Sequence, residues 1–374
     1  MKIVYISKSI IPSRSANSIH VMKMCQALAQ LGHEVILLAP RSQKTEPGIT
    51  DPFAFYGVEP CFELRYASVR RGYGWWTAVT ARRENADLVY GRYLNGCVYA
   101  GWLGLPTIFE SHAPDHEGKR WDSWLFGKIL GSSQLRCLVV ITRALSHYYQ
   151  QQYGLESARI QVVPDAADPP SLIKAADALV LDNSRLHVGY IGQLYAGKGM
   201  ELIYRLAQQC PWAAFHVVGG GEKELAYWRQ RANGQDNLIL HGFVPHAQTN
   251  RYRQAFDVVL APYQQQVAVY GGRGDVANWM SPLKLFEYMA AGKAIICSDL
   301  PVLREVLRHE ETALLCPPDD LASWQAALVR LRDDVTLRQR IATTAQQTFR
   351  EKYTWTARAR RVLAIAQGTA VTHA

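Results

Sequence analysis

The stretch LHVGYIGQLYAGKGME, residues 186–201, shows most directly what kind of fold this chain adopts. A short apolar run predicts a buried strand, glycines mark the turn after it, and a helical pattern begins near Met200. A strand, a tight turn and a helix in this order form the repeating unit of parallel α/β sheets.

The same unit recurs on both sides of residues 186–201. Near-continuous apolar runs are typical of strands in a parallel sheet, because helices cover both of its faces. Helical patterns separate these runs, beginning with one from about Ser18 to Leu31, and the chain looks wholly helical from Leu321 to about Gln367. The expected strands are 2–7, 34–40, 87–92, 106–111, 137–142 and 160–165, then 186–192, 214–220, 238–244, 257–263, 294–299 and 313–318.

The fold class predicted from this alternation is α/β, with two consecutive doubly wound domains. A chain of 374 residues is longer than a single core usually organises. The stretch after Ala166 is rich in Ala, Asp and Pro and has no clear strand, which indicates a connection. We expect a first domain over 1–168, a linker over 169–185, a second domain over 186–355 and a C-terminal helix over 356–374. Ligands should bind at the carboxyl ends of the strands.

The composition indicates which classes of binding partner the protein could have. The formal net charge of +9 favours phosphates, nucleotides or lipid head groups, and the excess is not concentrated in either half. The even distribution, without a basic stripe, argues against nucleic acid. Seven scattered cysteines suit reduced thiols in a cytoplasmic protein, and no signal peptide or membrane span is evident. We therefore expect a soluble, cytoplasmic protein with at most peripheral membrane contact.

Two segments of the second domain carry candidate chemistry. Lys198 follows a strand and precedes a helix, where backbone amides and the helix dipole favour an anion such as a diphosphate. In SPLKLFEYMAAGK, residues 281–293, Ser281 is a natural N-cap and Pro282 suits the first helical position. The next amides would then be available to an anion. A solvated lysine in a tight turn is the simpler interpretation of Lys198.

Glu287 is unusual because it lies in an otherwise apolar helix. An exposed pair with Lys284, three residues away, is one explanation. The alternative is a partly buried carboxylate, which needs hydrogen-bond donors, and the vicinal hydroxyls of a ribose would provide two. The loop after the first strand, SKSIIPSRSANS, lacks the G-x-G-x-x-G pattern, which argues against an ordinary nicotinamide or flavin site.

Taken together, these motifs resemble those of the retaining glycosyltransferases of glycosyltransferase family 4. The resemblance covers essentially the whole chain, and the final motif indicates the subgroup with SPLKLFEYMAAGK. It implies the GT-B architecture, in which two Rossmann-like domains face each other across a cleft. The matching segments are 16–35, FESH (109–112), VVPDAAD (162–168), GQLYAGKG (192–199), VVGGGE (217–222), LHGFVP (240–245), FDVVLAPY (256–263) and 281–307.

The resemblance also implies roles for individual residues. Lys198 would neutralise the diphosphate of the donor, Glu287 would bind the ribose, and His112 would lie beside the transferred sugar. These three are the expected catalytic residues. The other expected donor-binding residues are Ala16, Asn17, Gly192, Gln193, Gly220, Phe243, Ser281, Pro282, Leu283, Lys284 and Leu285. For His112 a hydrogen-bonded loop histidine is the simpler interpretation.

The sequence departs from the family pattern at several positions. Trp279 stands where many members have a first glutamate, eight residues before Glu287, and Gln193 stands where an arginine is common. Ala16 and Asn17 replace two glycines, and Asp165-Ala166 replaces Asn-Gly. The phosphate site therefore lacks one cation unless another residue supplies it, and Trp279 or Asp275 could make the missing sugar contact.

The activity implied is the transfer of a sugar from a nucleotide-diphosphate sugar to a hydroxyl of a glycan, glycolipid or small molecule, with retention. No cofactor and no metal are expected, since no acidic or histidine cluster is evident. Trp75, Trp76 and Trp121 are candidates for the acceptor, which could be lipid-linked at a membrane surface. They could equally be core residues. A sugar-nucleotide epimerase of the same architecture and a non-catalytic binder remain alternatives. The sugar, base, acceptor and oligomeric state stay open.

Overall fold

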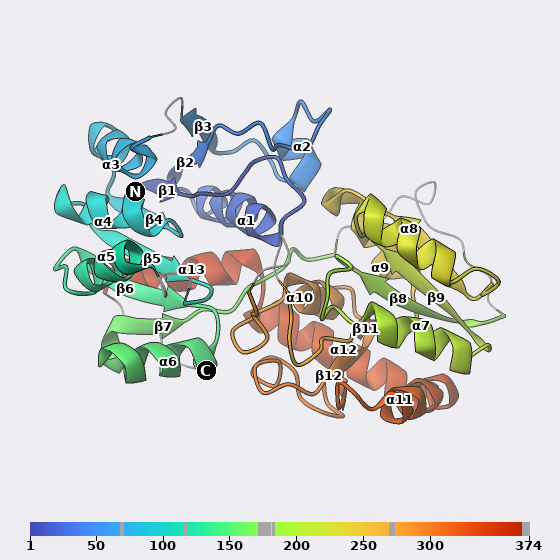
Figure 1. Ribbon diagram of the computed structural model, residues 1–374. Helices are drawn as coiled ribbons and strands as arrows, with labels where there is room; N and C mark the ends of the chain where they lie inside the picture. The colour runs from blue at the N-terminus through green and yellow to red at the C-terminus, as the bar shows by residue number, and fades with distance from the viewer. Residues whose placement is uncertain (68–70, 115–118, 171–180, 182–183, 269–273, 369–374) are drawn as a thin grey trace. The chain divides into compact units, whose positions relative to one another are not determined.

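The computed structural model describes residues 1–67, 71–114, 119–170, 181, 184–268 and 274–368. The chain forms two compact units (Figure 1). The N-terminal unit contains Met1–Asp165 together with Trp355–Ala374, and the C-terminal unit contains Ala166–Thr354. Most of the expected linker, 169–185, lies outside the described residues. Within the described part of the chain, no helix is long and apolar enough to cross a membrane.

The N-terminal unit is built on a parallel sheet of seven strands in the order β3-β2-β1-β4-β5-β6-β7. The order reverses between β1 and β4, which is where doubly wound sheets bind ligands. The strands are β1 (Lys2–Ile6), β2 (Glu34–Pro40), β3 (Glu63–Ala67), β4 (Leu88–Gly91), β5 (Thr107–Ser111), β6 (Leu135–Val140) and β7 (Ile160–Val162).

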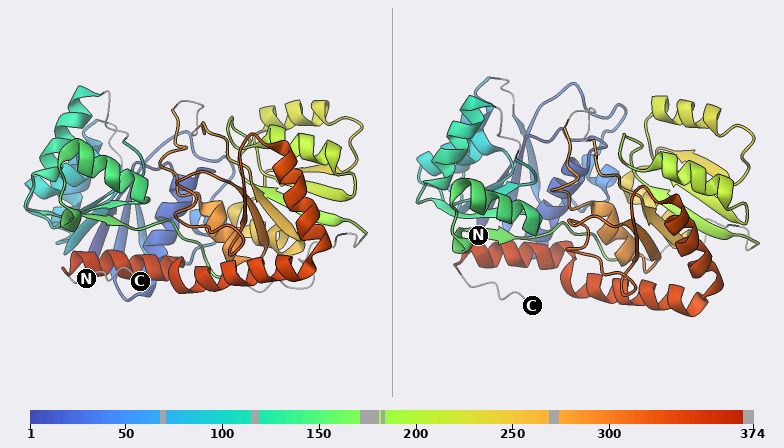
Figure 2. Two further views of the ribbon diagram at one scale, coloured as in Figure 1. Left: turned by 90° about the horizontal axis from the view of Figure 1, so that it is seen from below. Right: turned by 60° about the horizontal axis from the view of Figure 1, so that its bottom comes forward.

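Helices cover both faces of this sheet. On one face α3 and α4 pack on alternate side chains of β1, including Val4 and Ile6, and on the other face α1 packs against α13. Figure 2 shows α13 alongside α1, although the two helices lie at opposite ends of the sequence. The helices are α1 (Ala16–Gln30), α2 (Pro52–Tyr56), α3 (Tyr73–Arg83), α4 (Leu94–Trp102), α5 (Arg120–Leu130), α6 (Arg143–Tyr153) and α13 (Trp355–Ala366), with a 3-10 turn at Ser157–Arg159.

The C-terminal unit has a parallel sheet of six strands in the order β10-β9-β8-β11-β12-β13, with its reversal between β8 and β11. Helices α7, α8 and α11 cover one face, α9 and α10 cover the other, and α12 contributes to both cores. The strands are β8 (Leu186–Ile191), β9 (Ala213–Val218), β10 (Leu238–Gly242), β11 (Val258–Ala261), β12 (Ala294–Ser298) and β13 (Leu314–Cys316). The helices are α7 (Met200–Gln209), α8 (Glu222–Arg231), α9 (Thr249–Ala255), α10 (Leu283–Ala290), α11 (Leu321–Asp333) and α12 (Val335–Lys352), with a 3-10 turn at His246–Gln248.

The prediction of two doubly wound α/β domains is confirmed, and each of the expected strands coincides with an observed one. Strand β3 was missed, because its sequence ELRYA carries two charges and only its last residue is buried. The helical C-terminal stretch is confirmed and consists of three helices, α11, α12 and α13. Asp334 ends α11 and caps α12 by accepting a hydrogen bond from the Leu337 amide at 2.8 Å.

Candidate functional site

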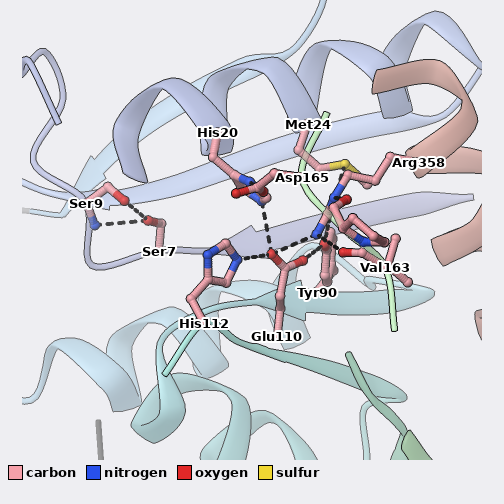
Figure 3. A network of polar contacts seen from close by, with 11 residues as sticks. Ser7, Ser9, His20, Met24, Tyr90, Glu110, His112, Val163, Asp165 and Arg358 are labelled. Atoms are coloured by element: carbon pink, nitrogen blue, oxygen red, sulfur yellow. Dashed lines mark hydrogen bonds and ion pairs between the residues drawn. The ribbon is translucent and has the colours of Figure 1, made fainter. Parts of the chain in front are cut away.

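In the N-terminal unit, a buried carboxylate lies at the centre of a polar network (Figure 3). Glu110 on β5 is 1% exposed, and its Oε1 lies 3.0 Å from the Arg358 guanidinium of α13. The Tyr90 hydroxyl donates a hydrogen bond to Oε2, and His112 Nε2 contacts Oε1. Strand β5 thus presents Glu110 to cationic and hydrogen-bonding side chains that come from distant parts of the chain.

Arg358 is itself fully bound within this network. Its guanidinium donates to the carbonyl oxygens of Pro164 at 3.0 Å and Val163 at 3.2 Å, and to the Tyr90 hydroxyl at 3.0 Å. Burial alone would lower the pKa of Arg358, but Glu110, Tyr90 and Asp165 together outweigh this effect and raise the pKa. The side chain is therefore a permanent buried cation that fastens α13 to the ends of the strands.

Histidine His20 of α1 lies between two carboxylates. Its Nδ1 is 2.7 Å from Asp165 Oδ1, and its Nε2 is 3.0 Å from Glu110 Oε1 without the alignment of a hydrogen bond. Burial favours the neutral form of each acid, yet Arg358 and His20 keep the pKa of Glu110 well below its usual range. His20 likewise lowers the pKa of Asp165. Both carboxylates are thus ionised at neutral pH.

The sequence-predicted residue His112 follows directly after β5 and is held by this network. Burial, reinforced by Arg92, lowers the pKa of His112 to about 4 despite the nearby Glu110. The imidazole is therefore neutral at pH 7. His112 Nε2–H donates a hydrogen bond to Glu110. The other ring nitrogen, Nδ1, therefore carries the lone pair that can accept a hydrogen bond from another group.

Three side chains of the network have the chemistry of metal ligands. One ligand atom each from His20, Glu110 and His112 lie within 4.8 Å of one another, the only such group among the described residues. The Arg358 guanidinium already contacts the Glu110 oxygen that both histidines face. A second cation there would be repelled by it, so the donor set does not fit a divalent metal well.

In the C-terminal unit, two lysines converge at the reversal of the sheet order. Lys284 Nζ lies 3.7 Å from the ring centroid of Tyr190 and 5.3 Å from that of Tyr263, and Lys198 Nζ lies 5.1 Å from the Tyr263 centroid. The Lys284 ammonium is buried and makes no hydrogen bond. A buried ammonium with no acceptor is costly, which makes this position suited to an anion.

The pKa values of both lysines reflect this environment. Burial lowers the pKa of Lys198 to about 8. Burial, and then the neighbouring charge of Lys198, lowers the pKa of Lys284 well below its ordinary value. A doubly charged ligand would stabilise the protonated forms of both lysines.

Two glycines, Gly192 and Gly199, lie beside the lysine pair at places where a larger side chain would not fit. Gly199, the N-cap residue before α7, has φ of 87°, and a Cβ there would overlap the Pro262 carbonyl oxygen. Gly192, directly after β8, has φ of 155°, and a Cβ there would lie 2.7 Å from Lys284 Nζ. Any larger residue at Gly192 would fill the space beside the unpaired ammonium.

Glu287 is bound by residues that the sequence did not indicate. Its Oε1 lies 2.6 Å from His246 Nε2, and Arg253 Nη1 donates to its Oε2 at 3.1 Å. Burial opposes ionisation, but Arg253 and His246 lower the pKa of Glu287 to about 2. The alternative explanation, an exposed pair with Lys284, is wrong, because His246 and Arg253 are the partners of Glu287. The carboxylate is ionised, and its oxygens still have lone pairs for a further donor.

The start of α10 corrects one prediction. The helix begins at Leu283, so Pro282 is the N-cap and Ser281 lies one residue outside, with no side-chain cap. The Leu285 amide donates a hydrogen bond to the Pro282 carbonyl oxygen at 3.0 Å, so it is not available to a ligand. This leaves the amides of Leu283 and Lys284 in the first turn, which have no partner within the helix.

The other residues that were predicted to bind the donor lie at different places in the two units. Ala16 and Asn17 form the exposed first turn of α1. The Gln193 carbonyl accepts a hydrogen bond from the Tyr190 hydroxyl at 2.6 Å. Gly220 lies in the turn before α8, and Phe243 follows β10. Their contacts with a donor stay predictions.

The three tryptophans named for the acceptor differ in environment. Trp76 is partly buried and stacks on Tyr73 with a centroid distance of 6.1 Å. Trp75 and Trp121 lie on exposed helix faces. Their role in acceptor binding also stays a prediction.

Two parallel, doubly wound units, each with a reversal in its strand order, define an α/β protein that binds ligands at the carboxyl ends of its strands. The family model "Glycosyltransferase Family 4" matches residues 18–169, and the model "Glycosyl transferases group 1" matches residues 185–334. Together the two matches account for most of the chain. The chain is a glycosyltransferase of the GT-B type.

Individual relatives are distant. The phosphatidyl-myo-inositol mannosyltransferase of Mycolicibacterium smegmatis is 24% identical over 90% of this chain and 86% of its own length. The amylovoran biosynthesis glycosyltransferase AmsK of Erwinia amylovora is 26% identical, and the match spans 53% of this chain and about half, 48%, of that protein. The solved structure of Anabaena Alr3699/HepE in complex with UDP has a TM-score of 0.73 at 15% identity, covering 98% of this chain and 100% of that one. HepE has also been solved with UDP-glucose.

Proposed function

We propose that the chain transfers a sugar from a nucleoside-diphosphate sugar to an acceptor hydroxyl, with retention at the anomeric carbon and without a metal. The observation that carries this proposal is the pair Lys198 and Lys284. Their ammonium groups share the Tyr263 ring, and that of Lys284 lacks any acceptor. A diphosphate would supply the missing negative charge.

An arginine is common in the family at the position of Gln193. The two lysines would supply the positive charge that this arginine provides in other members. Lys284 reaches the end of β8 from α10, and its ammonium lies where a side chain on Gly192 would otherwise be. The bond from the anomeric carbon to the diphosphate breaks with its electron pair on the phosphate oxygen. Two fixed cations and the first amides of α10 would stabilise that developing charge.

Retention would follow from attack on the same face of the sugar that the diphosphate leaves. The acceptor hydroxyl forms the new bond to the anomeric carbon, and its proton passes to the departing phosphate oxygen. This route requires no separate protein base. Glu287, ionised and braced by His246 and Arg253, would accept hydrogen bonds from the ribose hydroxyls.

His112 would position the transferred sugar. Glu110 fixes the tautomer of its neutral ring, so the Nδ1 lone pair would accept a hydrogen bond from a sugar hydroxyl. Glu110 and Arg358 act through His112 and are positioning residues. A neutral ring at this place also avoids repelling the positive charge that develops on the anomeric carbon.

Donor and acceptor classes follow from the named relatives. HepE binds UDP and UDP-glucose, so UDP-sugars are the first donors to test. AmsK and the mannosyltransferase are named for a polysaccharide and a glycolipid, so we propose a cell-surface glycan or a lipid-linked sugar as acceptor. The enzyme would work at the cytoplasmic side of the membrane, where nucleotide sugars are made.

A thermal-shift screen of nucleoside-diphosphate sugars tests the donor site, because a ligand that binds the native state raises the melting temperature. UDP-glucose, UDP-galactose and GDP-mannose are compared with the free sugars, each with and without EDTA. At least one nucleotide sugar should raise the melting temperature with EDTA present. If none does, the donor site is wrong, and a shift that EDTA abolishes contradicts metal independence.

Turnover distinguishes the transferase from an epimerase. A transferase releases nucleoside diphosphate only in step with acceptor glycosylation, whereas an epimerase converts the donor sugar with no acceptor present. Proton NMR of the product gives the anomeric configuration. An inverted product would contradict the same-face mechanism.

A further inference from the structure

Three histidines of the C-terminal unit form a row of hydrogen bonds across its sheet. His187 on β8, His216 on β9 and His241 on β10 come from adjacent parallel strands. His187 Nδ1 lies 3.0 Å from His216 Nε2, and His216 Nδ1 lies 3.0 Å from His241 Nε2. His187 and His216 are buried, at 8% and 4% exposure, and His241 is partly buried. None of these three residues, which we call the histidine chain, takes part in the proposed sugar transfer.

The hydrogen bonding of the histidine chain depends on how many protons it carries. Each link requires one N–H group that faces one lone pair, so three neutral rings satisfy both links when their tautomers point in the same direction. One added proton is still accommodated, because the extra N–H group can point outward. A second added proton places two N–H groups opposite one another and breaks a link. The two links therefore require that at least two of the rings are neutral.

The surroundings of the histidine chain oppose even the first added proton. Burial, and then the neighbouring His241 and His187, lowers the pKa of His216 to about 3. Burial, and then the Arg251 guanidinium of α9, lowers the pKa of His241. At the other end, an Asp257 carboxylate oxygen accepts a hydrogen bond from the His187 amide at 2.8 Å. The histidine chain thus has a cation at one end and a carboxylate at the other, and the cation adds to the effect of burial on His241.

A shared metal ion does not account for the histidine chain. The middle ring uses both of its nitrogens in the two links, so the ligand atoms form a line and do not converge on one point. Among the residues that the structure describes, only His20, Glu110 and His112 bring ligand atoms of three side chains within 4.8 Å of one another. The chemistry left to the histidine chain is the binding of protons.

Helix α9 packs on the histidine chain through two aromatic rings. The Phe256 ring, directly after α9, stacks on His216 with a centroid distance of 5.2 Å. The Tyr252 ring, on α9 itself, meets His241 edge-on at 5.1 Å. Protonation of the rings beneath α9 would therefore disturb the surface on which this helix lies.

Helix α9 and strand β10 also lead to the two partners of Glu287. Arg253 is on α9, and its Nη1 donates a hydrogen bond to Glu287 Oε2 at 3.1 Å. His246 lies in the turn after β10, and its Nε2 is 2.6 Å from Glu287 Oε1. The segments that contact the histidine chain are thus the segments that hold the carboxylate of Glu287.

We propose that the histidine chain is an acid-sensitive switch that controls the donor site. With neutral rings it holds β10 and α9 in place, and with added protons it releases them, so that Arg253 and His246 no longer fix Glu287. Donor binding then weakens as the solution becomes acidic. The effect on binding rests on the proposed role of Glu287 at the ribose, whereas the effect on stability does not.

Urea unfolding of the full chain at pH 7 and pH 5 tests the switch, in a range above that in which Glu287 titrates. An unfolded histidine takes up a proton below its pKa of about 6.5, whereas a ring of the intact histidine chain stays neutral. The folding equilibrium constant should therefore fall, by up to about 25-fold over this range for each such ring. His216→Gln keeps a donor and an acceptor for the two links but does not titrate, so its loss should be smaller by about tenfold.

A control variant and a second measurement make the test specific. His147→Gln removes an exposed histidine from α6 and should keep the pH dependence of the parent. Equal pH dependence of His216→Gln and the parent would overturn the proposal. In NMR spectra of the parent, the ring signals of His216 should change with pH only together with those of Tyr252 and Phe256. Titration of His216 near pH 6.5 with unchanged signals of the two aromatic rings would also overturn it.

Binding of UDP-glucose connects the switch to the donor site. The diphosphate of this probe is esterified at both ends and keeps its charge between pH 7 and pH 5.5. Over this range the Kd of the parent should rise by up to about tenfold, and that of His216→Gln by less than about twofold. Equal changes in the two proteins would overturn control of the site by the histidine chain. If UDP-glucose binds at no pH, the proposed function loses this donor, and the unfolding and NMR results still decide whether the switch exists.

Discussion

The Arg358 guanidinium lies 3.0 Å from the Glu110 carboxylate, although the two residues come from α13 and β5. Both side chains are almost completely buried, at 2% and 0% exposure. This ion pair ties the last helix to the strand that presents His112. The helix is thereby part of the same network as the candidate sugar-binding histidine, and its effect on that histidine can be tested.

Replacing Arg358 by Met should strongly destabilise the N-terminal unit. The change leaves Glu110 and Asp165 buried with less positive charge, and breaking a buried ion pair costs about 3–5 kcal/mol. Urea unfolding followed by circular dichroism measures the loss. Arg360→Met is the control, because Arg360 is exposed on the same helix and its removal should change stability by less than about 0.5 kcal/mol. Equal effects of the two variants would show that the network is not important for stability.

Replacing Glu110 by Gln should affect turnover through His112. The amide can no longer hold the Nε2 proton as an ionised acceptor, so the ring loses its fixed tautomer. With the donor and acceptor identified, kcat should fall about tenfold or more while the Kd for UDP stays within twofold. A parallel change in UDP binding would instead indicate that the fold is disturbed, and unchanged kcat would contradict the positioning role.

Removing Lys284 should have opposite effects on stability and binding. Lys284→Met eliminates a buried ammonium that has no hydrogen-bond acceptor, so the free energy of unfolding should rise, by about 1 kcal/mol. The Kd for UDP should increase about tenfold, which is 1.4 kcal/mol. Calorimetry and urea unfolding measure the two quantities. Lys223→Met, which removes an exposed lysine from α8, should change neither. Unchanged UDP binding by Lys284→Met would exclude its role.

Binding of UDP should weaken in alkaline solution. In the free protein the pKa of Lys198 is lowered to about 8, so its ammonium loses a proton as pH rises through that value. The anion requires the charged form, and the Kd should therefore rise above pH 8, by up to about tenfold per unit. Titrations between pH 7 and 9 test this. Lys198→Arg stays charged, so its profile should be flatter and keep only the part that Lys284 contributes, whereas an identical profile for both proteins would refute the assignment to Lys198.

Acid should destabilise the C-terminal unit through Glu287. Its pKa is lowered to about 2 in the folded state, so its ionised form adds stability at any pH above the unfolded value near 4.5. That stability is lost as pH falls from about 4.5 to 2, and it amounts to about 3 kcal/mol at most. Unfolding of the parent and of Glu287→Gln is compared at pH 6 and pH 3. The parent should lose more stability over this interval, and equal losses would contradict the depressed pKa.

The sequence by itself determined the fold and, from local position, one lysine of the candidate anion site, whereas Lys284 was named only through the family resemblance. Each expected strand is present because runs such as LHVGYI are apolar enough to be buried, and burial depends on local composition. Lys198 was identifiable because its position between a strand and a helix is fixed by adjacent residues. Edge strand β3 was missed for the same reason, since its charged sequence resembles a loop.

Only the tertiary structure decided which side chains meet. Lys284 looked like the partner of Glu287 because they are three residues apart, but Glu287 is bound by His246 and Arg253, and the Lys284 ammonium lies over Tyr190. The pairing of Arg358 with Glu110 and the linking of three histidines from three strands are likewise contacts between distant segments. Hydrophobic periodicity specifies where a segment is buried, but the partner of a buried charge depends on which elements the completed fold places next to it.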